Sequence, residues 1–169
     1  MNKIIRKIQY SEKVYRFDVE APLIAKSRKA GNFVIIRVDA NSERMPLTIA
    51  DADIEKGTIT LVVQKVGLSS TKLCNLNEGD EIHDVVGPLG NPTHIENFGT
   101  VLCAGGGVGV APMLPIIKAL KAAGNRVLSV IAGRSKDLVI MEDEVRASSD
   151  ELIIMTDDED REAEGDLLG

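Results

Sequence analysis

The stretch CAGGGVGVAP, Cys103 to Pro112, constrains the fold of this chain more than any other. An apolar run precedes it, and a run of helical periodicity that ends at Gly124 follows it. A strand, a turn nearly free of Cβ atoms and a helix with proline in its first turn are typical of a parallel sheet. We therefore expect a strand–turn–helix unit in the C-terminal part of the chain.

The residues after position 100 repeat this alternation. Three apolar runs, TVLCAG, RVLSVIAG and ELIIMTD, predict strands, and TVLCAG is continuously apolar, as parallel strands covered on both faces tend to be. Helical spacing recurs between them, first from Met113 to Leu120 and then from Leu138 through Met141 to Val145. The β-α-β-α-β order predicts a parallel sheet with right-handed crossovers, about half of an ordinary nucleotide-binding sheet.

The first 90 residues or so read as short strands separated by turn signals. Tyr15, Phe17 and Val19 alternate with charged residues, which is typical of a strand with one buried face. Five more strands are expected, at Lys3–Gln9, Asn32–Val38, Leu47–Ala50, 59–63 and Asp80–Val86. Six short strands would most economically close into an antiparallel barrel. One short helix, Leu68 to Leu76, is expected among them, with Ser69 or Ser70 as its N-cap.

The predicted fold class is therefore β plus α/β, a six-stranded antiparallel β-barrel followed by a partial parallel-sheet nucleotide-binding domain. The expected domains are residues 1–98 and 99–158. The acidic run at 159–169 has little to bury, so we expect a flexible tail.

Composition excludes several classes of function. The formal charge of −6 argues against nucleic acid or an anionic membrane as a partner, because both require a basic face. No apolar run approaches the length of a membrane span, and a cytoplasmic location is expected. Cys74 and Cys103 are expected to be buried free thiols, and His83 and His94 to be surface residues rather than metal ligands. No hydrolase motif occurs, so no catalytic residue or metal site is assigned.

The glycine-rich turn supports two interpretations. Gly105 and Gly107 match the first positions of the dinucleotide fingerprint G-x-G-x-x-G, but Val110 occupies the last. The turn and the start of the following helix would still leave backbone N–H groups free to face a phosphate. Alternatively, the glycines only allow close packing of helix on strand. At the end of the next strand, Arg134 could meet a ribose phosphate or lie on the surface, which leaves NAD and NADP open.

Two further features of the barrel half suit a phosphate. Arg44 precedes Pro46 and Thr48, and its planar guanidinium suits a pyrophosphate while the hydroxyl offers a hydrogen bond to a ring edge. The run GLSST begins with Gly67, which lets a backbone approach closely, and continues with hydroxyls at a helix start. Two such features on one barrel suggest a dinucleotide.

The ordered set RMPLTIAD, GLSST, GPLGNPT and AGGGVGVAP resembles the ferredoxin–NADP reductase superfamily. Within it, the motifs look closest to the small flavoprotein subunit of NADH-dependent reduced ferredoxin:NADP oxidoreductases, also described as a sulfide dehydrogenase subunit. Dihydroorotate dehydrogenase electron-transfer subunits are near neighbours. The resemblance covers residues 1 to about 158.

The resemblance implies an FAD on the barrel and a nicotinamide dinucleotide, NAD(H) or NADP(H), on the second domain. The residues it assigns to cofactor binding are Arg44 on the pyrophosphate, Pro46, Leu47 and Thr48 along the isoalloxazine, Gly67, Ser69, Ser70 and Thr71 on phosphate, Gly105, Gly106, Gly107 and Gly109 at the nicotinamide dinucleotide, and Gly133, Arg134 and, more weakly, Asp157 beside it. Relatives of this kind continue with more strands and a cysteine cluster that holds a [2Fe-2S] centre, whose ligands this sequence lacks.

The resemblance also implies the function. It predicts an oxidoreductase subunit that passes electrons between NAD(P)H and FAD and on to a larger flavoprotein or iron–sulfur partner. A catalytically silent flavin-binding or assembly module is the alternative from another class.

Overall fold

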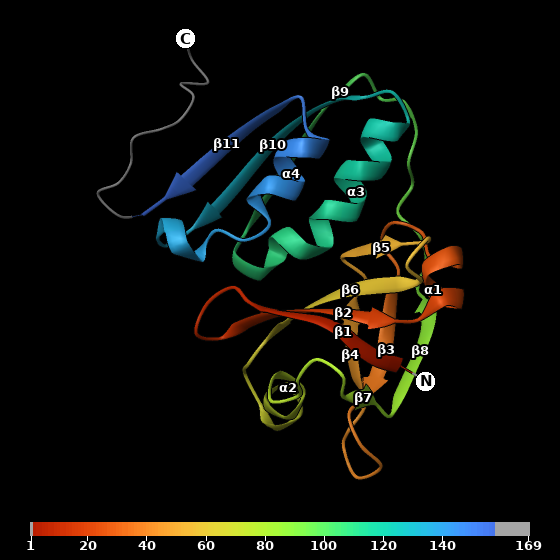
Figure 1. Cartoon of the computed structure of the whole chain (residues 1–169). Helices are drawn as coiled ribbons and strands as arrows, with labels where there is room; N and C mark the ends of the chain where they lie inside the picture. The colour runs from red at the N-terminus through yellow and green to blue at the C-terminus, as the bar shows by residue number, and fades with distance from the viewer. Residues whose placement is uncertain (1, 158–169) are drawn as a thin grey trace. The chain divides into compact units, whose positions relative to one another are not determined.

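The computed structural model describes residues 2–157 of the chain (Figure 1). The chain divides into two compact units, Met1–Thr93 and the part from His94 on, and each is described by itself. The domain ranges expected from the sequence stay a prediction, and the tail expected at 159–169 lies outside the described residues.

The first unit is built from antiparallel strands, as predicted. Its strands are β1 (Asn2–Gln9), β2 (Val14–Glu20), β3 (Phe33–Arg37), β4 (Met45–Thr48), β5 (Asp51–Asp53), β6 (Thr58–Gln64), β7 (Glu81–Ile82) and β8 (Asp84–Leu89). One sheet has the order β5-β6-β2-β1-β7, and a second has the order β4-β3-β8.

Two of the six predicted strands bend and serve both sheets, which is why eight segments are found. In the stretch from β4 to β5, the Ile49 N–H donates to the Asn32 carbonyl at 3.1 Å, whereas the Ala50 N–H donates to the Thr60 carbonyl at 2.9 Å. The stretch from β7 to β8 turns in the same way beside His83. Strands that pass from one sheet to the other form the corners of an orthogonal barrel. Counted as single strands, the two bends give the six-stranded antiparallel arrangement predicted above.

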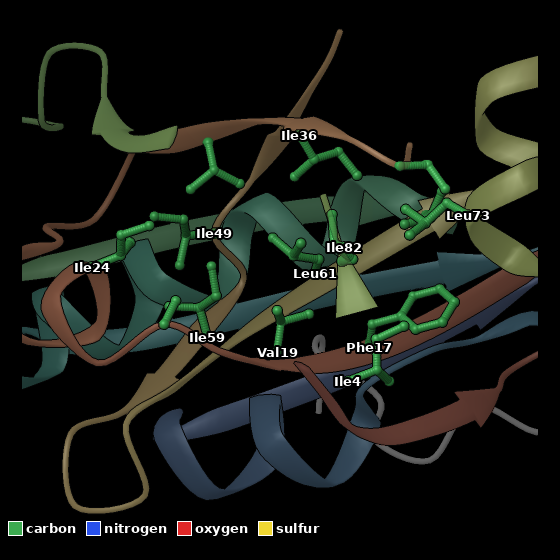
Figure 2. Close-up of a cluster of buried hydrophobic side chains, with 14 of the residues drawn as sticks. Ile4, Phe17, Val19, Ile24, Ile36, Ile49, Ile59, Leu61, Leu73 and Ile82 are labelled. Atoms are coloured by element: carbon green, nitrogen blue, oxygen red, sulfur yellow. The ribbon is translucent and has the colours of Figure 1, made fainter. Parts of the chain in front are cut away.

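The core of this unit follows the alternation seen in the sequence. Phe17 and Val19 of β2 and Ile59 and Leu61 of β6 are fully buried, and their side chains meet in one cluster (Figure 2). Leu73 enters the same cluster from a helix, so the helix is held to the barrel by an apolar contact. Burying an aliphatic side chain of this size contributes about 1.5–3 kcal/mol.

Two short helices accompany the strands. Helix α2 (Leu68–Cys74) was predicted, but its N-cap is Gly67 rather than Ser69 or Ser70. The Ser70 hydroxyl instead accepts hydrogen bonds from the N–H groups of Val66 and Gly67, at 3.0 and 2.9 Å, which closes the helix start from the third position. Helix α1 (Pro22–Ser27) was not predicted; proline opens it and six residues are too few to show a helical period.

The second unit contains the predicted parallel sheet. Strands β9 (Thr100–Gly106), β10 (Arg126–Gly133) and β11 (Glu151–Thr156) pair in the order β11-β10-β9, and both pairings are parallel. Helix α3 (Val110–Ala122) follows the glycine turn and ends before Gly124, whose φ of +92° is the left-handed conformation expected of a glycine just past a helix.

The second predicted helix is displaced. Leu138 ends a 3-10 turn (Lys136–Leu138), and Met141 adopts a left-handed φ of 58°. Helix α4 (Glu142–Ser148) therefore starts later than the spacing of Leu138, Met141 and Val145 indicated, and only Val145 of these lies on it.

The coverage on both faces expected for the strand TVLCAG, which is β9, is wrong for the described residues. Helices α3 and α4 contact each other as well as the sheet, so they lie on the same face (Figure 1). On β9, exposed Leu102 and Ala104 alternate with half-buried Val101 and Cys103. Among residues 2–157, no helix is long and apolar enough to cross a membrane.

Candidate functional site

The edge strand β4 carries a row of side chains that face away from the barrel core. Met45 and Leu47 pack against the core, whereas Pro46 is exposed and Thr48 is half-buried on the opposite side. Arg44 directly precedes the strand and is exposed, and it forms no ion pair or side-chain hydrogen bond with residues 2–157. A guanidinium without a carboxylate partner is available to an anion from solution.

The neighbouring strand extends this row with apolar surface. Phe33 of β3 lies opposite Thr48, and Ile35 lies opposite Pro46. Both are half-buried, while the alternating Val34 is fully buried. A flat apolar ring could rest on this surface with the Thr48 hydroxyl beside it. The sequence did not identify Phe33 and Ile35 as candidate site residues, because nothing in the sequence separates them from ordinary strand residues.

Leu47 is placed differently from the rest of its predicted group. Its side chain packs against the barrel core, on the face opposite to Pro46 and Thr48. Only its backbone can therefore face a ligand bound along the outer side of β4.

The turn before α2 has room for a ligand. A Cβ built on Gly67 would meet no protein atom within 4 Å, and the φ of −155° is extended backbone that any residue adopts. Neither packing nor backbone conformation explains this glycine. The first N–H groups of a helix lack intrahelical acceptors and attract anions. Ser69 and Thr71 are half-buried beside the turn, but the Ser70 hydroxyl is engaged in closing the helix start and stiffens the turn.

Lys72 brings the segment before Arg44 against α2. Its Nζ donates to Asp39 Oδ2 at 3.5 Å and to Ser42 Oγ at 3.4 Å. The Ser42 hydroxyl and then the Asn41 N–H hold the pKa of Asp39 below its ordinary value, so this carboxylate stays charged. The structure thus ties the loop that carries Arg44 to the helix that carries the Gly67 turn. No motif in the sequence pointed to Lys72.

The glycines at the end of β9 and in the turn after it are needed for different physical reasons. A Cβ on Gly105 would lie 3.2 Å from Met113 Sδ and 3.3 Å from the Gly109 carbonyl oxygen, so this glycine serves helix–strand packing. Gly107 has a φ of +55°, which favours glycine. A Cβ on Gly106 would make only ordinary contacts, and one on Gly109 would meet nothing within 4 Å. The packing interpretation therefore applies to Gly105, whereas packing does not explain Gly109, where the phosphate interpretation stays a prediction.

The end of β10 carries the remaining residues that were predicted to lie beside the nicotinamide dinucleotide. A Cβ on Gly133 would lie 3.0 Å from the Leu138 backbone, so glycine is needed to pack the following turn. Arg134 is exposed, and its carbonyl accepts a hydrogen bond from the Asp157 N–H at 3.3 Å. The structure therefore brings Arg134 and Asp157 together at the carboxyl ends of β10 and β11, where open α/β sheets bind their ligands.

The two cysteines and the two histidines show no sign of a chemical role. Cys74 is buried and Cys103 half-buried, both are free thiols, and burial raises the pKa of each, which disfavours the nucleophilic thiolate. His83 and His94 are exposed, as predicted. Within residues 2–157, no three His, Cys, Asp or Glu side chains gather closely enough to hold a metal ion.

Asn125 is a buried structural residue that the sequence analysis missed. Its Oδ1 accepts from the N–H groups of Phe98 and Gly99 at 2.7 and 3.1 Å, and its Nδ2 donates to the carbonyls of Glu96 and Leu120 at 2.8 and 2.9 Å. These four bonds fix the segment that enters β9.

Comparison with known proteins agrees with this architecture. The chain is 48% identical over 158 residues to the "Dihydroorotate dehydrogenase B (NAD(+)), electron transfer subunit homolog" of Thermotoga maritima, a match that covers 94% of this chain and 56% of the relative. A solved structure described as that of the NADH-dependent reduced ferredoxin-NADP oxidoreductase superimposes with a TM-score of 0.90 at 44% identity, over 93% of this chain and 57% of the other. The ferredoxin-NADP+ reductase from Plasmodium falciparum, at 16% identity, shares the fold with a TM-score of 0.72, over 92% of this chain and 68% of the other. No family model matches the chain.

A bent-strand antiparallel unit followed by a parallel sheet with a glycine turn is thus the fold that the ferredoxin-NADP+ reductase shares. The resemblance found in the sequence is confirmed. More particularly, it is a homologue of the Thermotoga maritima protein and of the NADH-dependent reduced ferredoxin-NADP oxidoreductase named above. The chain spans a little over half the length of these relatives.

Proposed function

We propose that this chain is a flavoprotein oxidoreductase subunit that passes electrons between NAD(P)H and FAD and on to a partner subunit or iron–sulfur centre. The observation that carries the proposal is the outward pair Pro46 and Thr48 on β4 with exposed Arg44 directly before the strand. Lys72 ties the loop that carries Arg44 to the helix with the open Gly67 turn.

The residues of the barrel unit fit FAD. Arg44 is a cation without a carboxylate partner in the described residues, and it would pair with the pyrophosphate through its planar fork. Thr48 would donate to the edge of the isoalloxazine, which Pro46 and the backbone of Leu47 would border. The Gly67 turn, with Ser69 and Thr71 and stiffened by Ser70, would receive a phosphate. A bound flavin supplies the redox chemistry by accepting a hydride, and the chain supplies binding and orientation.

The second unit fits a nicotinamide dinucleotide. The N–H groups at Gly106 and Gly109, in the turn shaped by Gly105 and Gly107, would face its phosphates. Arg134 and Asp157, beside Gly133, would meet its ribose side. An arginine suits a 2′-phosphate and a carboxylate suits a free 2′-hydroxyl, so both nucleotides remain candidates, with NAD(H) preferred because the names of the relatives above contain NAD(+) or NADH.

A partner subunit is proposed because the Thermotoga relative is itself named after a subunit. The Thermotoga relative carries the name of an electron transfer subunit homolog, so electron transfer to a dihydroorotate dehydrogenase is one form of this proposal. The [2Fe-2S] centre expected in full-length relatives would belong to polypeptide outside this sequence. The cytoplasmic location expected from composition stays a prediction.

A second candidate is a catalytically silent flavin-binding or assembly module. It is favoured by the sheet of residues 2–157, whose three strands are half of the ordinary dinucleotide-binding sheet.

The visible spectrum of the purified chain, reconstituted with FAD and then mixed anaerobically with NADH or NADPH, separates these candidates. The oxidoreductase should be yellow and lose its flavin absorbance with one of the nucleotides. A yellow protein that neither nucleotide bleaches supports the silent module. A colourless protein that cannot be reconstituted overturns both.

A further inference from the structure

Asn32, which directly precedes β3, is a polar residue buried in the barrel unit, with 6% of its surface exposed. Its Oδ1 accepts a hydrogen bond from the Lys29 N–H at 2.8 Å, and its Nδ2 donates to the Gly90 carbonyl at 3.1 Å. A buried amide is costly unless both its donor and its acceptor are satisfied, and here both are. Asn32 therefore joins the start of β3 to Gly90 of the segment GPLGNPT, 58 residues further along the chain.

The Gly90 turn lies against the ring of Phe33, the residue that follows Asn32. A Cβ on Gly90 would lie 2.9 Å from Phe33 Cε1 and 3.0 Å from its Cδ1, so only glycine lets the ring approach this closely. The φ of Gly90 is +86°, in the left-handed region that favours glycine. Because Asn32 holds Gly90 by its side chain, it also fixes the surface on which the Phe33 ring rests.

The backbone of Asn32 holds the end of β4. Its carbonyl accepts a hydrogen bond from the Ile49 N–H at 3.1 Å, and Ile49 directly follows Thr48. Phe33 and Thr48 lie opposite each other in the pairing of β3 with β4. Asn32 thus bonds to the neighbours of both residues that would offer an apolar surface and a hydroxyl to a flat ring.

We propose that Asn32 is a positioning residue for the flavin ring, which sets the Phe33 ring relative to the Thr48 hydroxyl and does not itself touch the cofactor. This inference rests on the proposed binding of FAD along β4. A bound ring is held in a defined place only when the side chains that touch it are themselves fixed by surrounding hydrogen bonds. The contacts and hydrogen bonds of the isoalloxazine determine its electronic properties, so a change at Asn32 should alter the flavin spectrum.

Asn32→Asp tests the bond to Gly90 by itself. The new carboxylate keeps an acceptor for the Lys29 N–H but has no donor for the Gly90 carbonyl, so at neutral pH the Gly90 turn and the Phe33 ring should shift. Burial raises the pKa of a carboxyl above its ordinary value of about 3.9. When the pH falls through that raised pKa, the protonated carboxyl donates its O–H to the Gly90 carbonyl, and the bond is restored.

The measurements are the visible absorption and circular dichroism spectra of each chain reconstituted with FAD, together with FAD titrations. At neutral pH, Asn32→Asp should displace the flavin bands and raise the dissociation constant for FAD about tenfold, and both should return toward the values of the parent chain in acid. Asn32→Ala should show both changes at every pH. If Asn32→Ala does not fold, the pH dependence of Asn32→Asp still decides the question.

Asn125→Ala is the matched control, because Asn125 is an equally buried asparagine that makes four hydrogen bonds in the second unit. It should melt at a lower temperature than the parent chain and keep the flavin spectrum and FAD affinity of the parent. If both Asn32 variants also melt earlier but keep the parent spectrum, Asn32 is only structural and the positioning role is overturned. If the parent chain itself binds no FAD, the proposed function fails, and this inference fails with it.

Discussion

Replacing Gly67 with alanine separates the stability of the barrel from its proposed affinity for FAD. In the chain alone, the new Cβ would meet no protein atom within 4 Å, and the extended φ of −155° suits alanine. Alanine restricts the unfolded chain, which contributes about 0.4–1 kcal/mol of stability. Alanine is a poorer N-cap than glycine, which costs a comparable amount of roughly 0.5–1 kcal/mol. The free energy of unfolding without ligand should therefore change by less than about 0.5 kcal/mol.

The effect on FAD should be much larger. If a phosphate approaches the Gly67 backbone, the methyl group occupies its path and removes a charge-assisted hydrogen bond worth about 1.5–3 kcal/mol. The dissociation constant for FAD should then rise about 10- to 100-fold. Quenching of FAD fluorescence during titration measures the constant, and urea denaturation followed by circular dichroism measures stability.

Gly109→Ala is the matched control, because its Cβ would also meet nothing within 4 Å but it lies in the second unit. It should leave FAD affinity unchanged and weaken the binding of NADH. Equal FAD affinity in Gly67→Ala and the parent chain would refute the proposal that the open space at Gly67 receives a phosphate of FAD.

Three further substitutions test other parts of the account. Arg44→Ala should lower FAD affinity about tenfold or more without changing stability. Lys56→Ala, the control at another exposed residue, should change neither FAD affinity nor stability. Equal flavin titrations for the two variants would exclude the pyrophosphate role. Asn125→Ala removes the four hydrogen bonds of a buried side chain and should cost about 2–4 kcal/mol in urea denaturation, with faster amide exchange in β9; a loss below about 0.5 kcal/mol would contradict it. The Lys121 ammonium, and then the Val127 N–H, hold the pKa of Asp150 below its ordinary value of 3.8, so its stabilising contribution is present above that pH and is lost as pH falls through the lowered pKa. Melting temperatures of the parent and Asp150→Asn should therefore differ at neutral pH and converge in acid; a difference that is constant with pH would contradict this assignment.

The sequence predicted the strands well where alternation or continuous apolar character identifies them. The predicted run RVLSVIAG corresponds to β10, Arg126–Gly133, and the antiparallel order of the barrel follows from buried alternation such as that of Phe17 and Val19. The sequence did not show that the stretch containing Ile49 and Ala50 turns between two sheets, because that bend depends on partners far along the chain.

The helix boundaries, and the coverage of the parallel sheet by helices, were harder to predict for similar reasons. Met141 continues a helical spacing but adopts a left-handed φ, and the turn before it packs closely on Gly133, a contact that no local pattern encodes. The apolar strand TVLCAG indicated burial on both faces, and the structure shows that the described helices supply only one.

The candidate site was predicted as a set of residue types but not in its details. Pro46 and Thr48 lie on one side of β4 and exposed Arg44 directly precedes the strand, while Leu47, grouped with them in the prediction, packs against the core. The roles of the glycines could not be ranked from sequence, since only the surroundings of each Cβ distinguish a packing glycine such as Gly105 from an open one such as Gly109.

The crystal structure of the chain reconstituted with FAD tests the central claim most directly. The account predicts that the pyrophosphate lies within hydrogen-bond distance of the Arg44 guanidinium, that a phosphate approaches the Gly67 turn, and that the isoalloxazine lies along Pro46 and Thr48. FAD bound elsewhere on the chain, with Arg44 and Gly67 facing solvent, would contradict it.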